Sequence, residues 1–288
     1  MKTICPFCKN PKSVVVLKSK KYTLVSCSNC SLEYLVPMPT SNQIKSLYQE
    51  DYFKSDKDLT GGYSDYHRME EVLKKESRRR IKFIKIFTSK NKLLDIGCSL
   101  GTFLTVAKDT GFDVSGNDIS AHAQRVVKSQ LKIPFYLGPV LQANLPQESF
   151  DIVTAWDVFE HIPKVSETFR SISKTLKPGG FLFLTTPNIK SWDSLVMGKY
   201  WYGYKKIPEH LVFFSPQSIK KILEANGFNI ITVKTWGFER DFKFLAQKAS
   251  LYIPGFQNIA SPILNLLHIQ NRSVYLPLTD MIVTARKT

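Results

Sequence analysis

The chain has 288 residues, a net charge of +16 from 40 basic and 24 acidic side chains, and 43% hydrophobic residues. This composition supports a folded core and excludes a disordered, collagen-like or disulfide-stapled chain. No apolar run reaches the roughly 18 residues of a membrane span, and the N-terminus lacks the apolar stretch of a signal peptide, so we expect a cytoplasmic protein. The basic excess is interpreted as solvated surface, with attraction to anionic nucleotide-sugars, lipid head groups or RNA as the alternative.

The first 40 residues carry two Cys-x-x-Cys pairs among three short predicted strands, with 18 residues between the pairs. The pairs are Cys5 with Cys8 and Cys27 with Cys30. Each pair aims two thiolates at one point, and the hairpin between them lets four sulfurs close a tetrahedron around zinc. Because four cysteine ligands leave no open position, we predict a structural zinc in a zinc-ribbon-like module over residues 1–40.

Residues 41–88 are expected to form a linker and capping helices, with a short helix and loop over 41–65 and an amphipathic helix over 66–88. From Lys92 onward, predicted strands and helices alternate. This alternation predicts an α/β, Rossmann-like doubly wound and mostly parallel sheet in a domain over 89–288. The predicted strands are 92–96, 113–117, 135–137, 152–155, 181–185, 229–235 and 280–285, and the predicted helices are 102–110, 121–130, 166–176 and 216–226.

The first strand of this domain leads into a turn that carries two glycines. The turn runs from Asp95 through Gly97 and Ser99 to Gly101, which opens the next helix. Gly97 lets the backbone approach a ligand closely. Asp118 ends the second strand, 23 residues after Asp95, where a carboxylate can accept hydrogen bonds from both hydroxyls of a ribose.

Two later segments complete the pattern: Asp157 at the end of a predicted strand, and a Lys-Pro-Gly-Gly turn over 177–180. In order, the four segments resemble the class I S-adenosylmethionine-dependent methyltransferases over about residues 80–235. The resemblance implies that S-adenosylmethionine is the cofactor, with the glycine turn facing its methionine part and the second-strand acid holding its ribose. Carried over by position, the cofactor-binding residues are Asp95, Gly97, Ser99, Gly101, Asp118 and Asp157.

The chain departs from that family's pattern at two places. Ser99 stands where the family often has glycine, and a serine side chain can be accommodated at this position. The family often has an acid near the adenine after the third strand, whereas residues 140–145 contain none. Gln142 and Ala143 are therefore the candidates for adenine contacts.

Methyl transfer to a hydroxyl or a carbon acid requires an aligned acceptor and a base that removes its proton. Two histidine motifs follow the fourth and fifth strands: Glu160-His161 and Glu209-His210. Histidine titrates near neutrality and can accept a proton at cellular pH. We assign His210 as the base with Glu209 as its support, and keep His161 as an alternative base or a wall of the site.

The Glu209-His210 pair, followed by Phe214-Ser215, resembles a subgroup of zinc-bearing methyltransferases. That subgroup includes nucleotide-sugar C-methyltransferases and small-molecule enzymes of cell-surface glycan pathways, and the resemblance implies that the pair places the base. The sugar C-methyltransferases are longer and carry a further C-terminal domain, so O-methylation of a sugar or related metabolite fits at least as well. The wider set that includes the ubiquinone-pathway O-methyltransferases is a looser match.

Residues 236–278 form an apolar insertion before the final strand. It is expected to be a helical cap or a dimer contact, or else a peripheral surface that meets a lipid-linked substrate at the inner face of the membrane. The aromatic cluster over 200–204 is expected to wall an acceptor pocket or to form a packed lid.

Two other functions compete with a small-molecule or glycan methyltransferase. The zinc module and the positive charge suggest an RNA methyltransferase, but residues 185–188 are Thr-Thr-Pro-Asn and lack the Asn-Pro-Pro-aromatic turn used on exocyclic amino groups. The basic residues also show no interleaving of arginine with aromatics, so a nucleic-acid partner is disfavoured. The other competing function is that of a non-catalytic subunit that has the cofactor-binding fold.

Overall fold

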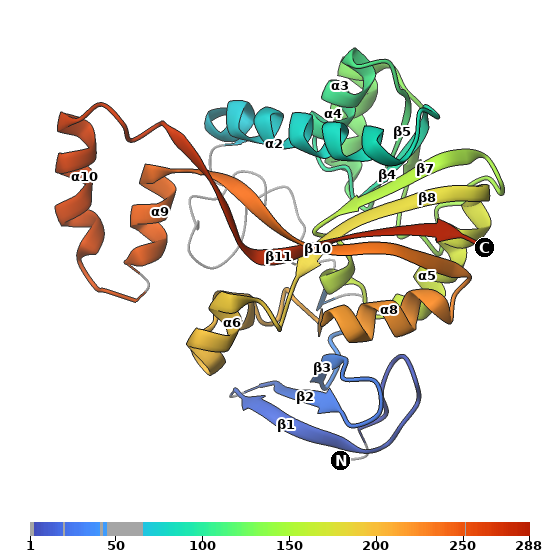
Figure 1. The fold of residues 1–288 in the computed structure, drawn as a ribbon, viewed down its shortest axis with the longest axis horizontal. Helices are drawn as coiled ribbons and strands as arrows, with labels where there is room; N and C mark the ends of the chain where they lie inside the picture. Colours follow the sequence, from blue (N-terminus) through green and yellow to red (C-terminus); the bar gives the residue numbers. More distant parts are fainter. Residues whose placement is uncertain (1–2, 20, 41–42, 45–65, 251) are drawn as a thin grey trace.

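The computed structural model describes residues 3–19, 21–40, 43–44, 66–250 and 252–288 (Figure 1). Apart from residues 43 and 44, the short helix and loop predicted over 41–65 lie outside these described residues. No helix in the described ranges is long and apolar enough to cross a membrane.

The main sheet has seven strands, and the predicted Rossmann-like, mostly parallel architecture is confirmed. They are β4 (Lys92–Ile96), β5 (Asp113–Asp118), β6 (Phe135–Leu137), β7 (Phe150–Trp156), β8 (Leu176–Pro187), β10 (Phe228–Asp241) and β11 (Ser273–Lys287). Their order is β10-β11-β8-β7-β4-β5-β6, and only β11 pairs antiparallel with its neighbours. The chain runs from β4 outward to β5 and β6 and then returns to β7 on the other side of β4, so the order of the strands reverses between β4 and β7. Open α/β sheets bind their ligands at such a switch point.

Helices cover both faces of this sheet (Figure 1). One face carries α2 (Tyr66–Phe87), α3 (Thr102–Asp109) and α4 (Ala121–Leu131), and the other carries α5 (Val165–Thr175) and α8 (Pro216–Glu224). The apolar stripe of α2 buries Ile81, Phe83 and Ile84 against the sheet, as its helical periodicity predicted. This burial holds α2 across the sheet edge at which a ligand would bind.

The N-terminal module forms a second sheet that the main domain completes. Its strands are β1 (Ser13–Lys18), β2 (Thr23–Cys27) and β3 (Glu33–Val36), and the fourth is β9 (Val212–Phe213). Glu33 pairs with Phe213 and Tyr34 with Val212, both antiparallel. The module is therefore joined by backbone pairing to the segment that directly follows His210.

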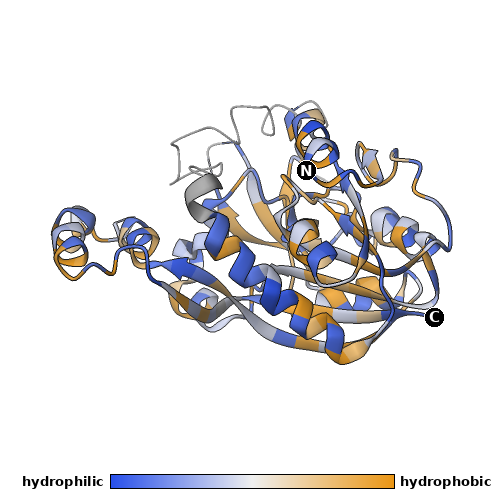
Figure 2. Cartoon of the chain, turned by 90° about the horizontal axis from the view of Figure 1, so that it is seen from above, coloured by the Kyte–Doolittle hydropathy of each residue, from blue (hydrophilic) through white to orange (hydrophobic). Residues whose placement is uncertain are grey.

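Several segments differ from the predicted elements; α6 (Trp192–Met197), for example, lies where no helix was predicted. The turn over 177–180 lies inside β8, with Gly179 at φ +70°. The hairpin of β10 and β11 extends far beyond its predicted strands, because cross-strand pairing continues to Asp241 and Ser273. The helical part of the insertion is thus the arm over 242–272, with α9 (Phe242–Ala249) and α10 (Phe256–Leu266), which projects from the body (Figures 1 and 2).

Candidate active site

The glycine turn lies between β4 and α3, at the carboxyl edge of the sheet. Gly97, Ser99 and Gly101 all have positive φ, at +69°, +50° and +84°. A Cβ on Gly97 would lie 2.6 Å from Cγ2 of Val158, so both backbone conformation and space favour glycine there. Ser99 is not glycine, and its left-handed backbone is the kind of local strain that functional sites hold.

Asp118 lies at the end of β5, as predicted, and its carboxylate ties two backbone segments together. The backbone N–H of Ser99 donates to Oδ2 at 2.9 Å, and the N–H of Ser120 donates to Oδ1 at 2.9 Å. Burial raises the pKa of Asp118, while these two hydrogen bonds act in the opposite direction. Asp118 thus shapes the turn, and each oxygen keeps a lone pair that could accept from a ribose hydroxyl.

Asp95 lies beside the turn and is buried. Thr154 Oγ1 donates to Asp95 Oδ1 at 2.6 Å. Burial raises the pKa of Asp95 to about 7, against the opposing effects of the Thr154 hydrogen bond and the charge of Arg80. A carboxyl that titrates near neutrality at the edge of a cavity responds strongly to a cationic ligand.

Asp157 follows β7 and carries a positive φ of +57°. Thr185 Oγ1 donates to its Oδ1 at 2.8 Å, and Arg80 of α2 donates to its Oδ2 at 3.4 Å. Arg80 also pairs with Glu76 at 2.6 Å and lies over the Trp156 ring, 4.7 Å from its centroid. The helix α2 therefore places the cation of Arg80, whose side chain is 11% exposed, at the edge of the strands.

One cavity gathers most of these groups. Asp95, Gly97, Ser99 and Asp157 line it, whereas Gly101 and Asp118 are not among its lining residues. Three lining residues supplied by distant elements were not predicted from the sequence: Glu76, Arg80 and Arg240. Trp156 also lines the cavity and directly precedes the predicted Asp157. The one available signal was the run of three arginines over 78–80 on the predicted amphipathic helix.

The cavity fits the cofactor that the sequence indicates. Ser99 Oγ and Trp156 Nε1 are buried there without a hydrogen-bond partner among the described residues. Buried polar groups without partners are costly, so these two atoms indicate that a polar ligand completes the site. Asp95 and Asp157 suit the ammonium of S-adenosylmethionine, and Arg80 suits its carboxylate.

The two histidine motifs meet at the same edge of the sheet. His161 lies in η2 (Phe159–His161), directly after β7, and its ring centroid is 4.8 Å from that of His210 with an interplanar angle of 80°. The side-chain ligand atoms of Glu160, His161 and His210 lie within 4.8 Å of one another. They form a compact group that can share a proton or hold a cation.

Burial keeps both imidazoles neutral. It lowers the pKa of His161 to about 4 and the pKa of His210 well below 6.5, and the charge of Lys206 acts in the same direction on both rings, so neither ring titrates near neutrality, contrary to what the sequence led us to expect. His161 Nδ1 donates to the backbone oxygen of Glu209 at 2.9 Å, because a carbonyl can only accept. His210 Nδ1 is buried with no hydrogen-bond partner in the described part of the chain.

Glu209 contributes to the group mainly through its backbone. Its carbonyl orients His161, as described above, while its side chain lies 3.9 Å from Lys206 Nζ. Burial raises the pKa of Glu209, and the charge of Lys206 opposes that effect. The side chain thus points to Lys206, and the predicted support of His210 by Glu209 stays a prediction.

The aromatic cluster over 200–204 is largely packed. Trp201 is buried against Tyr204 and Phe213, with ring centroids 5.1 and 6.5 Å away. The Tyr204 hydroxyl donates to Glu33 of β3 at 2.8 Å. The cluster was expected either to wall an acceptor pocket or to form a packed lid, and these contacts match the packed lid. Through Tyr204 and Glu33 the cluster also contacts the N-terminal module.

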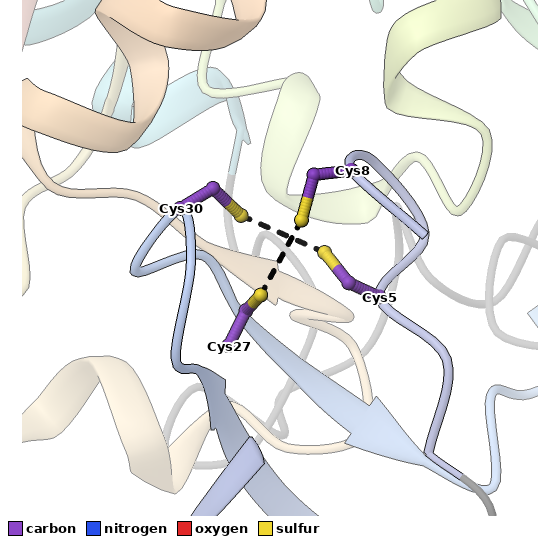
Figure 3. A group of neighbouring side chains, drawn as sticks. All are labelled: Cys5, Cys8, Cys27 and Cys30. Atoms are coloured by element: carbon purple, nitrogen blue, oxygen red, sulfur yellow. Dashed lines mark hydrogen bonds between the residues drawn. The ribbon is translucent and has the colours of Figure 1, made fainter. Parts of the chain in front are cut away.

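The four N-terminal cysteines converge as predicted (Figure 3). Their sulfurs lie within 4.8 Å of one another, with Cys5 Sγ 3.6 Å from Cys30 Sγ and Cys8 Sγ 3.4 Å from Cys27 Sγ. A tetrahedron with zinc–sulfur bonds of about 2.3 Å requires sulfur separations of roughly 3.8 Å. The donor set and its spacing therefore fit a closed zinc site.

The chain has a Rossmann-like methyltransferase fold. A solved S-adenosylmethionine-dependent methyltransferase from Archaeoglobus fulgidus superposes with a TM-score of 0.52 at 23% identity, covering 76% of this chain and 94% of that one. The cyclase SpnF superposes with a TM-score of 0.51 at 18% identity, covering 87% and 97%. At these identities the superpositions show the fold alone.

The sequence comparison shows the family. The methyltransferase domain family matches residues 66–233, and this chain belongs to it. Among curated relatives, a ubiquinone biosynthesis O-methyltransferase of Idiomarina loihiensis is 26% identical over 190 residues, covering 61% of this chain and 75% of that protein. Another of the same name, from Hydrogenovibrio crunogenus, is 32% identical over 139 residues, covering 46% and 55%.

Proposed function

We propose that the chain transfers the methyl group of S-adenosylmethionine to an oxygen atom of a small-molecule acceptor. The family and the names of the relatives support this class of reaction. Those relatives belong to the ubiquinone-pathway set, which is the looser of the sequence resemblances, so they support O-methylation more than methylation of a nucleotide-sugar. A sugar or glycan acceptor stays a prediction from sequence alone.

The observation that carries the proposal is the buried, unpartnered Nδ1 of His210 beside His161. A buried, neutral imidazole can take the proton of an acceptor hydroxyl as that oxygen becomes a nucleophile. The Glu209 carbonyl holds the His161 ring by its Nδ1–H, so His161 can orient or relay without turning. We assign His210 as the base and His161 as its neighbour in the same group.

The cofactor supplies an electrophilic methyl group when bound, and the chain's residues hold it in the cavity. We propose that Asp95 and Asp157 bind its ammonium and Arg80 its carboxylate, and that Asp118, outside the lining of this cavity, binds its ribose. Ser99 Oγ and the Gly97 backbone complete the turn around it. We also propose one structural zinc at the four cysteines, which leaves no open position for catalysis.

The test is a transfer assay with methyl-labelled S-adenosylmethionine against three acceptor classes: hydroxylated aromatics, nucleotide-sugars and RNA. The proposal expects label on a hydroxylated small molecule, with loss of transfer in His210→Ala. Label on RNA with steeply salt-dependent binding would favour the RNA reading instead. Tight cofactor binding with no transfer in any class would favour a non-catalytic subunit.

A further inference from the structure

Helix α10, in the arm, presents an apolar stripe to solvent. Phe256, Ile259, Ile263 and Leu266 recur at spacings of three and four, so they share one face of the helix. Leu266 exposes 80% of its surface, and no residue of this helix is buried. Figure 2 shows hydrophobic residues gathered along one side of the arm's helices. An unpartnered stripe of this kind marks a contact surface.

A second exposed apolar stripe lies on α6 (Trp192–Met197), where Trp192, Leu195 and Val196 face solvent. The hydroxyl of Tyr252, in the arm, donates to the backbone oxygen of Tyr200 at 3.4 Å, just beyond this helix. This hydrogen bond links the arm to the segment just after α6, and the two stripes are considered together as one region. We call it the arm surface, and its principal residues are Trp192, Leu195, Tyr252, Ile259, Ile263 and Leu266.

The charged residues of the two segments that form the arm surface are almost all basic. Residues 242–272 contain three basic side chains and neither Asp nor Glu; the three are Lys243, Lys248 and Arg272. The segment over 189–206 contains four lysines and one acid, Asp193, whose carboxylate accepts a hydrogen bond from Trp201 Nε1 at 2.7 Å. At the junction, Lys205 Nζ lies 3.8 Å from the Tyr252 ring centroid.

This charge pattern favours an anionic lipid surface over a second copy of the chain as the partner of the arm surface. A symmetric contact with a second copy places the same patch against itself, so the lysines of both copies would repel each other. An anionic lipid surface complements the same lysines, and each basic residue near such a surface contributes favourably. Tyrosine and tryptophan at the junction are also the side chains that suit the boundary between head groups and acyl chains.

We propose that the arm surface docks on an anionic lipid bilayer. The stripes of α10 and α6 enter the boundary between head groups and acyl chains, and the surrounding lysines and Arg272 meet the head-group phosphates. This inference does not depend on the methyl acceptor, because docking needs neither cofactor nor turnover.

The test is sedimentation with phosphatidylcholine vesicles that either contain or lack phosphatidylglycerol. We expect the full chain to bind the anionic vesicles, and binding to weaken at high salt. Leu266→Glu and Ile259→Glu should each reduce binding about tenfold or more, because an apolar contact is lost and a negative charge is added. Ile86→Glu, at an exposed position on α2, is the matched control and should bind like the wild type.

Circular dichroism and cofactor titration show whether each variant is folded, so a binding loss is not mistaken for misfolding. Equal vesicle binding by Leu266→Glu and the wild type would overturn the proposal, as would absence of binding to anionic vesicles. A wild-type dimer in sedimentation velocity that Leu266→Glu dissociates, without vesicle binding, would assign the surface to a second copy instead.

Discussion

The backbone N–H of Leu35 in β3 donates a 3.0 Å hydrogen bond to the carbonyl oxygen of Leu211, the residue after His210. The N–H of Leu211 in turn donates to the Glu160 carbonyl at 2.7 Å. The loop that carries His210 is therefore fixed between the cysteine module and η2. The N-terminal module therefore helps to hold the loop that carries His210.

Zinc should be needed for stability and for turnover more than for cofactor binding. We expect about one zinc per chain, and Cys30→Ser should lower metal content and stability, since the affinity of a structural zinc is folding free energy. Because Cys30 leads directly into β3, turnover should also fall, while cofactor affinity changes little. Metal analysis and calorimetry measure these effects, with the exposed Ser28→Ala as control. Metal-free wild type, or a fully stable Cys30→Ser, would refute this prediction.

Asp118→Ala should weaken binding of S-adenosylmethionine by roughly 1.5–3 kcal/mol, the range for hydrogen bonds to a charged group. The loss has two sources, the ribose contact and the Ser99 N–H that Asp118 holds. Gly97→Val should abolish binding, because its Cβ would meet Val158. Isothermal titration measures both, and Asp113→Ala, exposed at the start of the same strand, should keep wild-type affinity. Unchanged affinity in the first two variants would rule out this site.

Cofactor affinity should rise with pH through about 7 because of Asp95. Burial raises its pKa to about 7, so the empty site is protonated below that pH, and a cationic ligand binds the ionised form better. For the same reason, the stability of the ligand-free protein should fall as pH rises from about 4 to 7, since the folded state binds the extra proton. Titrations across this pH range in buffers of different ionisation heat should show proton release on binding at acidic pH. Asp95→Asn should flatten this dependence, and a pH-independent wild type would contradict it.

His210→Ala should lower turnover by roughly 10²–10⁴-fold, the usual contribution of a general base, with cofactor affinity nearly unchanged. His161→Ala should have a smaller effect, or one that follows stability. Steady-state kinetics and calorimetry on both variants separate these effects. Normal turnover in His210→Ala with an inactive His161→Ala would reverse the two roles, and normal turnover in both would leave positioning as the source of catalysis.

Sequence predicted the parts of the site that are local in the chain. The turn from Asp95 to Gly101 and the carboxylate of Asp118 are each set by a few neighbouring residues, and their backbone positions follow from strand, turn and helix periodicity. The four cysteines were predictable for the same reason, because ligand spacing within each pair fixes the geometry.

The remaining parts depend on contacts between distant residues. Arg80 reaches Asp157 across 77 positions, and Leu35 pairs with Leu211 across a still longer separation. Neither contact leaves a periodic trace in the sequence. Likewise, β10 and β11 continue past their predicted apolar segments because each strand pairs with the other. The pairing partner of a strand cannot be deduced from the sequence of that strand alone.

The central claim is tested most directly by finding which atom receives the methyl group. Wild-type protein would be incubated with S-adenosylmethionine carrying a carbon-13 methyl group and the hydroxylated acceptor found in the assay, and the product analysed by nuclear magnetic resonance. The account predicts a labelled methyl carbon attached to oxygen, formed by the wild type and not detectably by His210→Ala in the same time. A labelled methyl attached to carbon or nitrogen would contradict it.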